Sequence, residues 1–137
     1  VFLKQKLENK PFTIVGNGKQ KRDFIHVSDV CDAFTKAIFS KNKNEIYNIG
    51  NGLPKSVNEM VRLIGGKKIF IPKRPGEPSI TCANITKVKS KLKWKPKVSL
   101  NEGVNDVLKN IDYWKNATLW NKNNIKKATK NWFKYLK

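Results

Sequence analysis

The sequence contains no run of about 18 consecutive apolar residues, and its opening VFLKQKLENKPF is too polar for the apolar region of a signal peptide. We therefore expect a cytoplasmic chain without a membrane partner. Cysteine is also scarce, because Cys31 and Cys82 are the two thiols and neither has another Cys or a His at metal-ligand spacing. Two reduced thiols and no metal site are expected.

Groups that commonly carry catalysis are few. His26 is the single histidine, and its position between two β-branched residues favours a structural role over acid–base catalysis. No Gly-x-Gly-x-x-Gly turn follows a predicted strand, no Walker A sequence occurs, and no Ser or Cys lies in a recognisable nucleophile motif. These residues by themselves are not expected to form a self-contained enzyme, and no catalytic residue is assigned.

Positive charge is abundant: 29 basic against 10 acidic residues give a net charge of +19. Such an excess is typical of nucleic-acid binding, because neutralised phosphates release their counterions. The lysines are spread along the whole chain, however, and recognition surfaces usually rely on arginine, of which there are three. A compositional bias is the favoured interpretation. Attraction to an anionic small substrate and a basic nucleic-acid-binding module remain the alternatives, and no specific nucleic-acid partner is expected.

Short strands and helices alternate in the predicted secondary structure. Strands are expected at residues 12–15, 24–27, 46–49 and 68–71. Helices are expected at residues 1–8, 28–38, 57–64, 84–92 and 100–115, with a further amphipathic pattern over 121–137. The tetrapeptides SVNE and SLNE are capping boxes that begin two of these helices, at Ser56 and Ser99. This mixture predicts an α/β fold.

Residues 1–8 read as the end of a helix whose N-cap is missing, which predicts that the chain is a fragment of a longer protein.

Two arginines lie beside predicted loops. Arg22 follows a glycine turn, and Arg74 lies in the segment 72–78, which three prolines exclude from regular structure. A guanidinium binds a diphosphate through two parallel hydrogen bonds, where lysine acts as a point charge. Glu77, three residues after Arg74, is suited to accept hydrogen bonds from ribose hydroxyls. The simpler alternatives stay open: a salt bridge from Arg22 to Asp23 or another nearby acid, and a solvated charge at Arg74.

Two segments resemble the extended short-chain dehydrogenase/reductases. The first comprises GNGKQKRDFIHVSDVCDAF with EIYNIGNG after it, and resembles the family's pattern of glycines, Arg-Asp-aromatic and Val-x-Asp-Val. The second is KRPGEPSITCANITKVKSKLKWKPKVSLNEGV, similar to the family's later segment, in which an arginine-bearing loop precedes a helix and a Trp-x-Pro turn. The resemblance covers residues 1 to about 116, and the most similar group is that of the UDP-galactose 4-epimerases.

This resemblance implies a division of the chain. Residues 1–117 would be the carboxy-terminal nucleotide-sugar-binding portion, with incomplete Rossmann elements and a small mixed α/β lobe, and residues 118–137 an amphipathic helical tail. The family binds NAD in an amino-terminal Rossmann domain that also carries a Tyr-x-x-x-Lys pair, and this chain contains neither feature. The chain alone would then lack activity, NAD would be bound by that other domain, and the full-length protein would be a homodimer.

The resemblance also implies ligand-binding roles. Arg22 and Arg74 match the family's diphosphate-binding arginines, and Glu77 matches the ribose-binding acid of the epimerases. Thr13 and Val15 match the strand that binds the base, mainly through backbone groups. The resemblance favours a 4-epimerase acting on a UDP-sugar, with an NDP-sugar 4,6-dehydratase or a UDP-glucuronate decarboxylase as alternatives.

Some positions depart from the family pattern. Asn84 replaces an aspartate but is an equally good helix cap. Lys93 stands where the family has glycine, so a positive φ is expected there. The amphipathic tail is not general in the family, and we expect it to dock on the domain absent from this chain or on a partner subunit.

Overall fold

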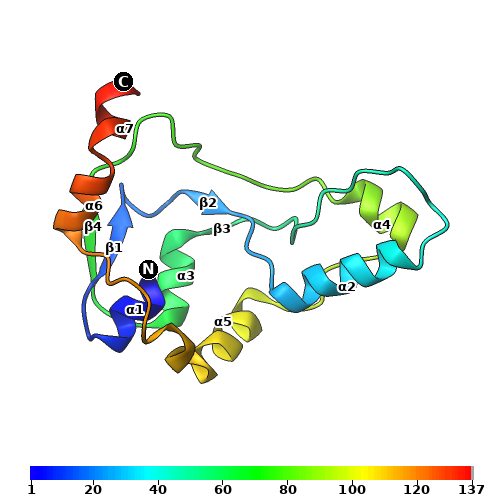
Figure 1. The fold of residues 1–137 in the computed structure, drawn as a ribbon, viewed down its shortest axis with the longest axis horizontal. Helices are drawn as coiled ribbons and strands as arrows, with labels where there is room; N and C mark the ends of the chain where they lie inside the picture. Colours follow the sequence, from blue (N-terminus) through cyan, green and yellow to red (C-terminus); the bar gives the residue numbers. More distant parts are fainter. Residues whose placement is uncertain (137) are drawn as a thin grey trace.

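Two separate hydrophobic cores organise the chain in a computed structural model, which describes residues 1–136. The first core is formed by Phe12, Ile14, Val61, Ile64 and Val104. The second core is formed by Ala33, Ile85, Val88, Leu92 and Trp94. Figure 1 shows the two corresponding lobes at opposite ends of an elongated molecule, joined by extended segments.

The first lobe contains a parallel strand pair covered by helices. Strands β1 (Phe12–Val15) and β4 (Lys68–Ile71) are hydrogen-bonded in parallel, with Thr13 opposite Ile69. Helices α1 (Phe2–Leu7), α3 (Val57–Ile64) and α5 (Leu100–Lys109) pack beside them. Phe12 and Ile14 are almost fully buried, so β1 lies at the centre of this core.

The second lobe pairs helix α2 (Val27–Ile38) with helix α4 (Thr86–Leu92). Trp94 is buried between them and its Nε1 donates a hydrogen bond to the carbonyl oxygen of Asp29, at 3.1 Å. Lys93, which precedes this tryptophan, has φ of 52°, so the expected positive φ is confirmed. Its left-handed conformation ends α4 and turns the chain toward α5.

A narrow ladder lies between the lobes (Figure 1). Strands β2 (Lys21–Arg22) and β3 (Lys55–Ser56) pair in antiparallel orientation, and Lys21 forms a further bridge to Ile80. Three segments that are distant in the sequence therefore meet at Lys21.

The capping boxes and the two longest strands occur where the sequence predicts them. Ser56 and Ser99 each accept the backbone amide of the glutamate three residues later, and each glutamate carboxylate accepts the serine's backbone amide. The helix over residues 57–64 and the strands over 12–15 and 68–71 have the expected bounds.

Two predicted strands are wrong. Residues 24–26 are irregular, and α2 already begins at Val27. Its N-cap is His26, whose imidazole Nδ1 accepts the amide of Ser28 at 3.4 Å. Residues 46–49 are irregular as well, since no strand of the described chain pairs with them.

Two predicted helices have different bounds. The helix from residue 100 ends at Lys109 and not near 115; the Asn110 side chain donates to the Asp106 carbonyl, and a 3-10 turn, η1 (Ile111–Trp114), follows. Helix α4 starts at Thr86, and its N-cap is Ile85 and not Asn84; the Asn84 side chain accepts the Thr86 amide at 3.0 Å from one residue before the N-cap.

The tail forms two short helices, α6 (Lys122–Ala128) and α7 (Lys130–Tyr135). Asn121 caps the first with a capping box to Asn124. In the structure the tail contacts residues of this same chain. The Gln5 side chain donates to the Trp120 carbonyl oxygen, and the Trp132 indole donates to the Pro75 carbonyl oxygen. Lys137, the last residue of the predicted tail, lies outside the described residues.

The helices are short, and none within residues 1–136 is both long and apolar enough to cross a membrane. Cys31 and Cys82 are exposed free thiols on separate segments.

Candidate functional site

A cavity of about 410 Å³ lies at the carboxyl ends of β1 and β4. Because the two strands are parallel, Val15 and Ile71 end at the same edge of the pair, and the segments after them turn over that edge. From these segments residues 16–17, 19–21, 73 and 77–80 line the cavity, together with Val15. The carboxyl edge of a parallel sheet is where α/β proteins usually bind ligands.

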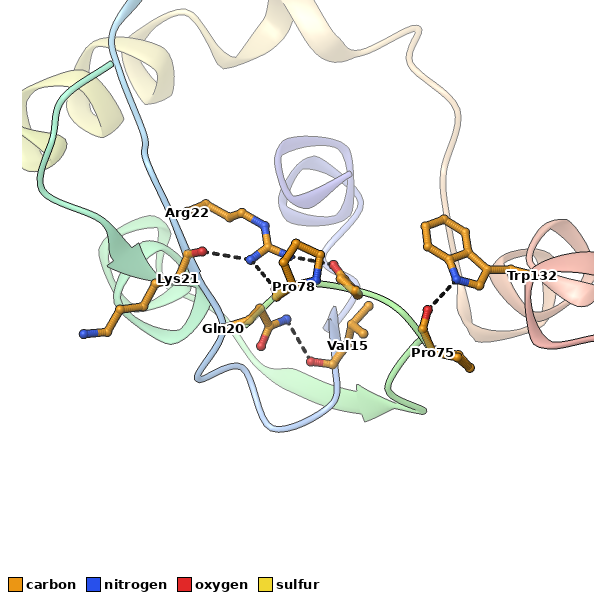
Figure 2. A network of polar contacts seen from close by, with 8 residues as sticks. Val15, Gln20, Lys21, Arg22, Pro75, Pro78 and Trp132 are labelled. Atoms are coloured by element: carbon orange, nitrogen blue, oxygen red, sulfur yellow. Dashed lines mark hydrogen bonds and ion pairs between the residues drawn. The ribbon is translucent and has the colours of Figure 1, made fainter. Parts of the chain in front are cut away.

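The first of these segments is a turn fixed by α3. Gly18 has φ of 72°, and a Cβ atom at this position would come within 2.4 Å of the Asn58 side chain. That side chain donates to the Asn17 carbonyl oxygen at 2.9 Å. Gln20 closes the turn from inside, because its Nε2 donates to the carbonyl oxygen of Val15 at 3.0 Å (Figure 2).

The cavity is lined by an excess of positive charge. Lys19, Lys21 and Lys73 lie among its described lining residues, whereas Glu77 is the one acid among them. Several cations around one opening attract an anion and raise its local concentration. The site is therefore suited to a ligand with two or more negative charges.

Arg22 and Glu77, which are 55 residues apart, form an ion pair at the edge of this cavity. The Nη2 atom of Arg22 is 2.9 Å from Oε1 of Glu77, and Nη1 donates to the carbonyl oxygens of Lys21 and Pro78 at 2.8 and 3.0 Å (Figure 2). The two side chains are 26% and 20% exposed. Glu77 lines the cavity, whereas Arg22 lies behind the lining and is joined to it through this pair. The acid that pairs with Arg22 is thus Glu77, and not its sequence neighbour Asp23.

Arg74 is placed differently. It does not line the cavity; its guanidinium carbon lies 5.6 Å from the centroid of the Trp132 ring, in a cleft between the loop and the tail. The neighbouring Lys73 faces the cavity. Successive side chains of an extended segment point to opposite sides, so one of these two cations faces the ligand cavity and the other faces the tail.

Thr13 and Val15 lie on the strand that leads into the cavity. The Phe12 amide donates to the carbonyl oxygen of Lys67, and the Gly16 amide donates to that of Ile71. Because alternate residues of a strand direct their backbone groups to opposite edges, those of Thr13 and Val15 point away from β4. The Thr13 hydroxyl is buried and accepts a hydrogen bond from Gln5 at 2.9 Å. The Thr13 amide donates to Oε1 of Gln5 at 3.3 Å, so the carbonyl oxygen of Thr13 is the group left for a ligand, whereas Val15 lines the cavity directly.

Sequence reasoning missed the cavity lysines. Lys19 and Lys21 follow the glycine turn, and Lys73 precedes Arg74. Because lysines occur throughout the chain, nothing in the sequence separates these three from the others.

It also missed the role of Asp23. This carboxylate accepts the backbone amides of Asn51, Gly52 and Ala83 at 2.8 to 3.2 Å, and so holds together three segments behind Arg22. The Arg-Asp-aromatic motif was the signal that pointed to it.

The glycine turn after β1 does not have the form of a Rossmann dinucleotide site. The glycine turn after β1 leads into the short strand β2 and not into a helix, so it lacks the strand–turn–helix geometry that binds a pyrophosphate on helix amides. No hydride-transfer step is assigned to residues 1–136.

A basic cavity at the carboxyl edge of a parallel pair, with a helix-covered core, is characteristic of the ligand-binding portion of an α/β protein. The family model described as GDP-mannose 4,6 dehydratase matches residues 1–107. The chain therefore belongs to the nucleotide-sugar epimerase and dehydratase family of extended short-chain dehydrogenase/reductases. This confirms the family inferred from the two sequence segments, and the α/β fold.

Individual relatives agree with this assignment. A putative UDP-glucose 4-epimerase of Methanocaldococcus jannaschii is 39% identical over 114 residues, which are 79% of this chain and 36% of that protein. A UDP-glucuronate 4-epimerase of Thermodesulfobacterium geofontis is 34% identical over 131 residues, 90% of this chain and 37% of that protein. The chain thus spans little more than a third of the length of these relatives.

A solved structure has the same fold. The UDP-glucuronic acid 4-epimerase of Bacillus cereus, in complex with UDP-glucuronic acid and NAD, superposes with a TM-score of 0.74 at 34% identity. The match covers 81% of this chain and 38% of that one. That relative binds NAD, in agreement with the cofactor expected for the family.

Proposed function

We propose that residues 1–136 bind the nucleotide-diphosphate part of a UDP-sugar in an NAD-dependent 4-epimerase. The observation that carries this proposal is the cavity at the carboxyl ends of β1 and β4, where three lysines and the Arg22–Glu77 pair meet. Such a site offers cations to a diphosphate and a carboxylate to a ribose within one opening.

Each part of the ligand has a candidate partner. Arg22 and the cavity lysines would bind the diphosphate, and the backbone of Thr13 and Val15 would contact the base. Glu77 would accept a ribose hydroxyl. Its ion pair with Arg22 uses Oε1, so Oε2 can accept that hydroxyl while the pair remains intact.

Arg74 remains a candidate for the diphosphate, although its guanidinium lies on the Trp132 ring. A cation–π contact at an exposed site contributes about 0.5–1 kcal/mol, whereas a charge-assisted hydrogen bond contributes about 1.5–3 kcal/mol. A diphosphate within reach therefore competes successfully for Arg74.

The rest of the enzyme would lie outside these residues. NAD, as in the Bacillus cereus relative, would be bound by another part of the protein, which we propose to be a cytoplasmic homodimer. The two 4-epimerase relatives favour epimerisation, and the dehydratase family model keeps a 4,6-dehydratase as the alternative. A UDP-glucuronate decarboxylase is the third candidate. Analysing the products from UDP-glucose and UDP-glucuronate by NMR distinguishes a C4 epimer, a 4-keto-6-deoxy sugar and a pentose.

Binding is tested by titrating UDP into the full natural protein in a calorimeter. Lys73→Ala removes a cation that lines the cavity and should weaken UDP binding about threefold to tenfold, while the affinity for uridine, which has no phosphate, should stay the same. Lys68→Ala is the matched control, since Lys68 begins β4 at the end away from the cavity. Equal losses from both substitutions, or no saturable binding of UDP, would contradict the proposal.

A further inference from the structure

The C-terminal helices contact the loop that lines the proposed nucleotide site. We infer that Trp132 on α7 is a positioning residue, which holds the 72–78 loop in the conformation that presents Lys73 and Glu77 to the cavity. This inference rests on the proposed function of the cavity. Trp132 lies beyond the segment that the family model matches, residues 1–107.

The contact is specific. The indole Nε1 of Trp132 donates a hydrogen bond of 2.7 Å to the carbonyl oxygen of Pro75 (Figure 2). The guanidinium carbon of Arg74 lies 5.6 Å from the centroid of the same ring. Trp132 thus contacts two consecutive loop residues, one through the backbone and one through the side chain. An indole has a single donor, and this geometry uses it entirely on the loop.

The tail is attached at its other end to the strand that leads into the cavity. Gln5, which is 1% exposed, donates through Nε2 to the carbonyl oxygen of Trp120 at 2.7 Å and to the hydroxyl of Thr13 at 2.9 Å. The tail therefore extends from β1 to the loop after β4, and both ends of this connection are hydrogen-bonded. Between them, Ile125 and Phe133 of the tail share a cleft with Ile71 and Pro72.

The loop has two distinct sides, and this makes its position matter for a ligand. Lys73 and Glu77 face the cavity, while Arg74 and Pro75 face the tail. Arg22 holds the far end of the loop through Glu77 and the Pro78 carbonyl, and Trp132 holds the near end. Fixing both ends before a ligand arrives reduces the entropy that binding must remove, so loss of either contact should weaken binding.

Trp132→Phe in the full natural protein separates the hydrogen bond from the stacking, because phenylalanine keeps a ring for Arg74 and removes the Nε1 donor. We expect UDP binding to weaken about threefold to tenfold. In the ligand-free protein, the backbone amides of the non-proline residues in 73–79 should exchange with deuterium faster, while those of α3 stay unchanged. Trp114→Phe is the matched control, since Trp114 lies on η1 against Tyr113 and should alter neither measurement.

The two measurements separate this inference from the proposed function. If UDP does not bind the unsubstituted protein, the proposed function is wrong, and the nucleotide role of Trp132 is wrong with it, whatever the exchange rates. If UDP binds and Trp132→Phe leaves both the affinity and the loop exchange unchanged, the positioning role alone is overturned. The same conclusion holds if Trp114→Phe has an equal effect. Weaker binding together with faster exchange confined to the loop supports the inference.

Discussion

At the scale of single residues, the loop after β4 divides its charges between two faces. Lys73 faces the cavity and Arg74 lies on Trp132, although the resemblance assigns the diphosphate to the arginine. A guanidinium stacks on aromatic rings better than an ammonium does, because it is planar and weakly hydrated. The placement of Arg74 over the indole is thus consistent with its chemistry, and its flexible side chain leaves it available to a diphosphate.

Arg74→Ala is expected to raise the dissociation constant for UDP about tenfold. The lost charge-assisted contact is partly offset, because the substituted protein no longer gives up a cation–π contact when it binds UDP. Arg62→Ala is the control, since Arg62 is exposed on α3 and should leave the affinity nearly unchanged. Equal effects would show that general basic charge, and not a site, binds UDP.

At the scale of elements, α3 supports the glycine turn through Asn58, so the start of this helix affects the site. The Ser56 amide and the Ser56 hydroxyl both donate hydrogen bonds to the carboxylate of Glu59. These bonds, the amide's most of all, keep the pKa of Glu59 below its ordinary value. A carboxylate whose pKa is lowered in the folded state stabilises the protein at any pH above the ordinary pKa of the group. That contribution is lost as the pH falls from the ordinary pKa through the folded-state pKa.

Ser56→Ala should destabilise the full protein by about 1 kcal/mol at neutral pH, because the helix loses its N-cap. The difference from the unsubstituted protein should shrink as the pH falls from the ordinary glutamate pKa of 4.5 through the lower pKa of the folded state, because Glu59 then becomes protonated in both proteins. Urea unfolding at neutral and acidic pH measures both effects. Ser90→Ala, at an exposed position inside α4, is the control and should be neutral or slightly stabilising. An equal loss at both pH values would contradict the role of the Glu59 carboxylate.

At the scale of the whole molecule, the net charge of +19 is not confined to the cavity. Lysines occur in both lobes, and residues 113–137, which include the tail, contain no acidic residue. Charge spread in this way gives weak attraction to any polyanion without a defined interface.

The full protein should therefore retain DNA or RNA weakly and without sequence preference in filter-binding titrations at two salt concentrations. A nucleic-acid-binding module would instead bind at micromolar or lower concentration, with a steep loss of affinity as salt rises, because several phosphates are neutralised together. Submicromolar binding that persists at physiological salt would favour the rival function.

Local features of this chain were determined by the sequence alone. Ser56, Ser99 and their glutamates begin helices because each box satisfies its backbone amides within four residues, independently of the rest of the fold. The strands at 12–15 and 68–71 and the irregular loop of three prolines follow from equally local preferences. The two motif segments were likewise sufficient to identify the family.

Tertiary structure decided where distant residues meet. Residues 24–26 stay irregular because His26 caps α2, and β2 forms at Lys21–Arg22 because it pairs with β3. Arg22 and Glu77 are 55 residues apart, and Trp132 and Pro75 are 57 apart, so their contacts depend on the course of the whole chain. Periodicity and capping act over a few residues and carry no information about such pairs. The same limit left the orientations of Lys73 and Arg74 undetermined until the loop was placed between the cavity and the tail.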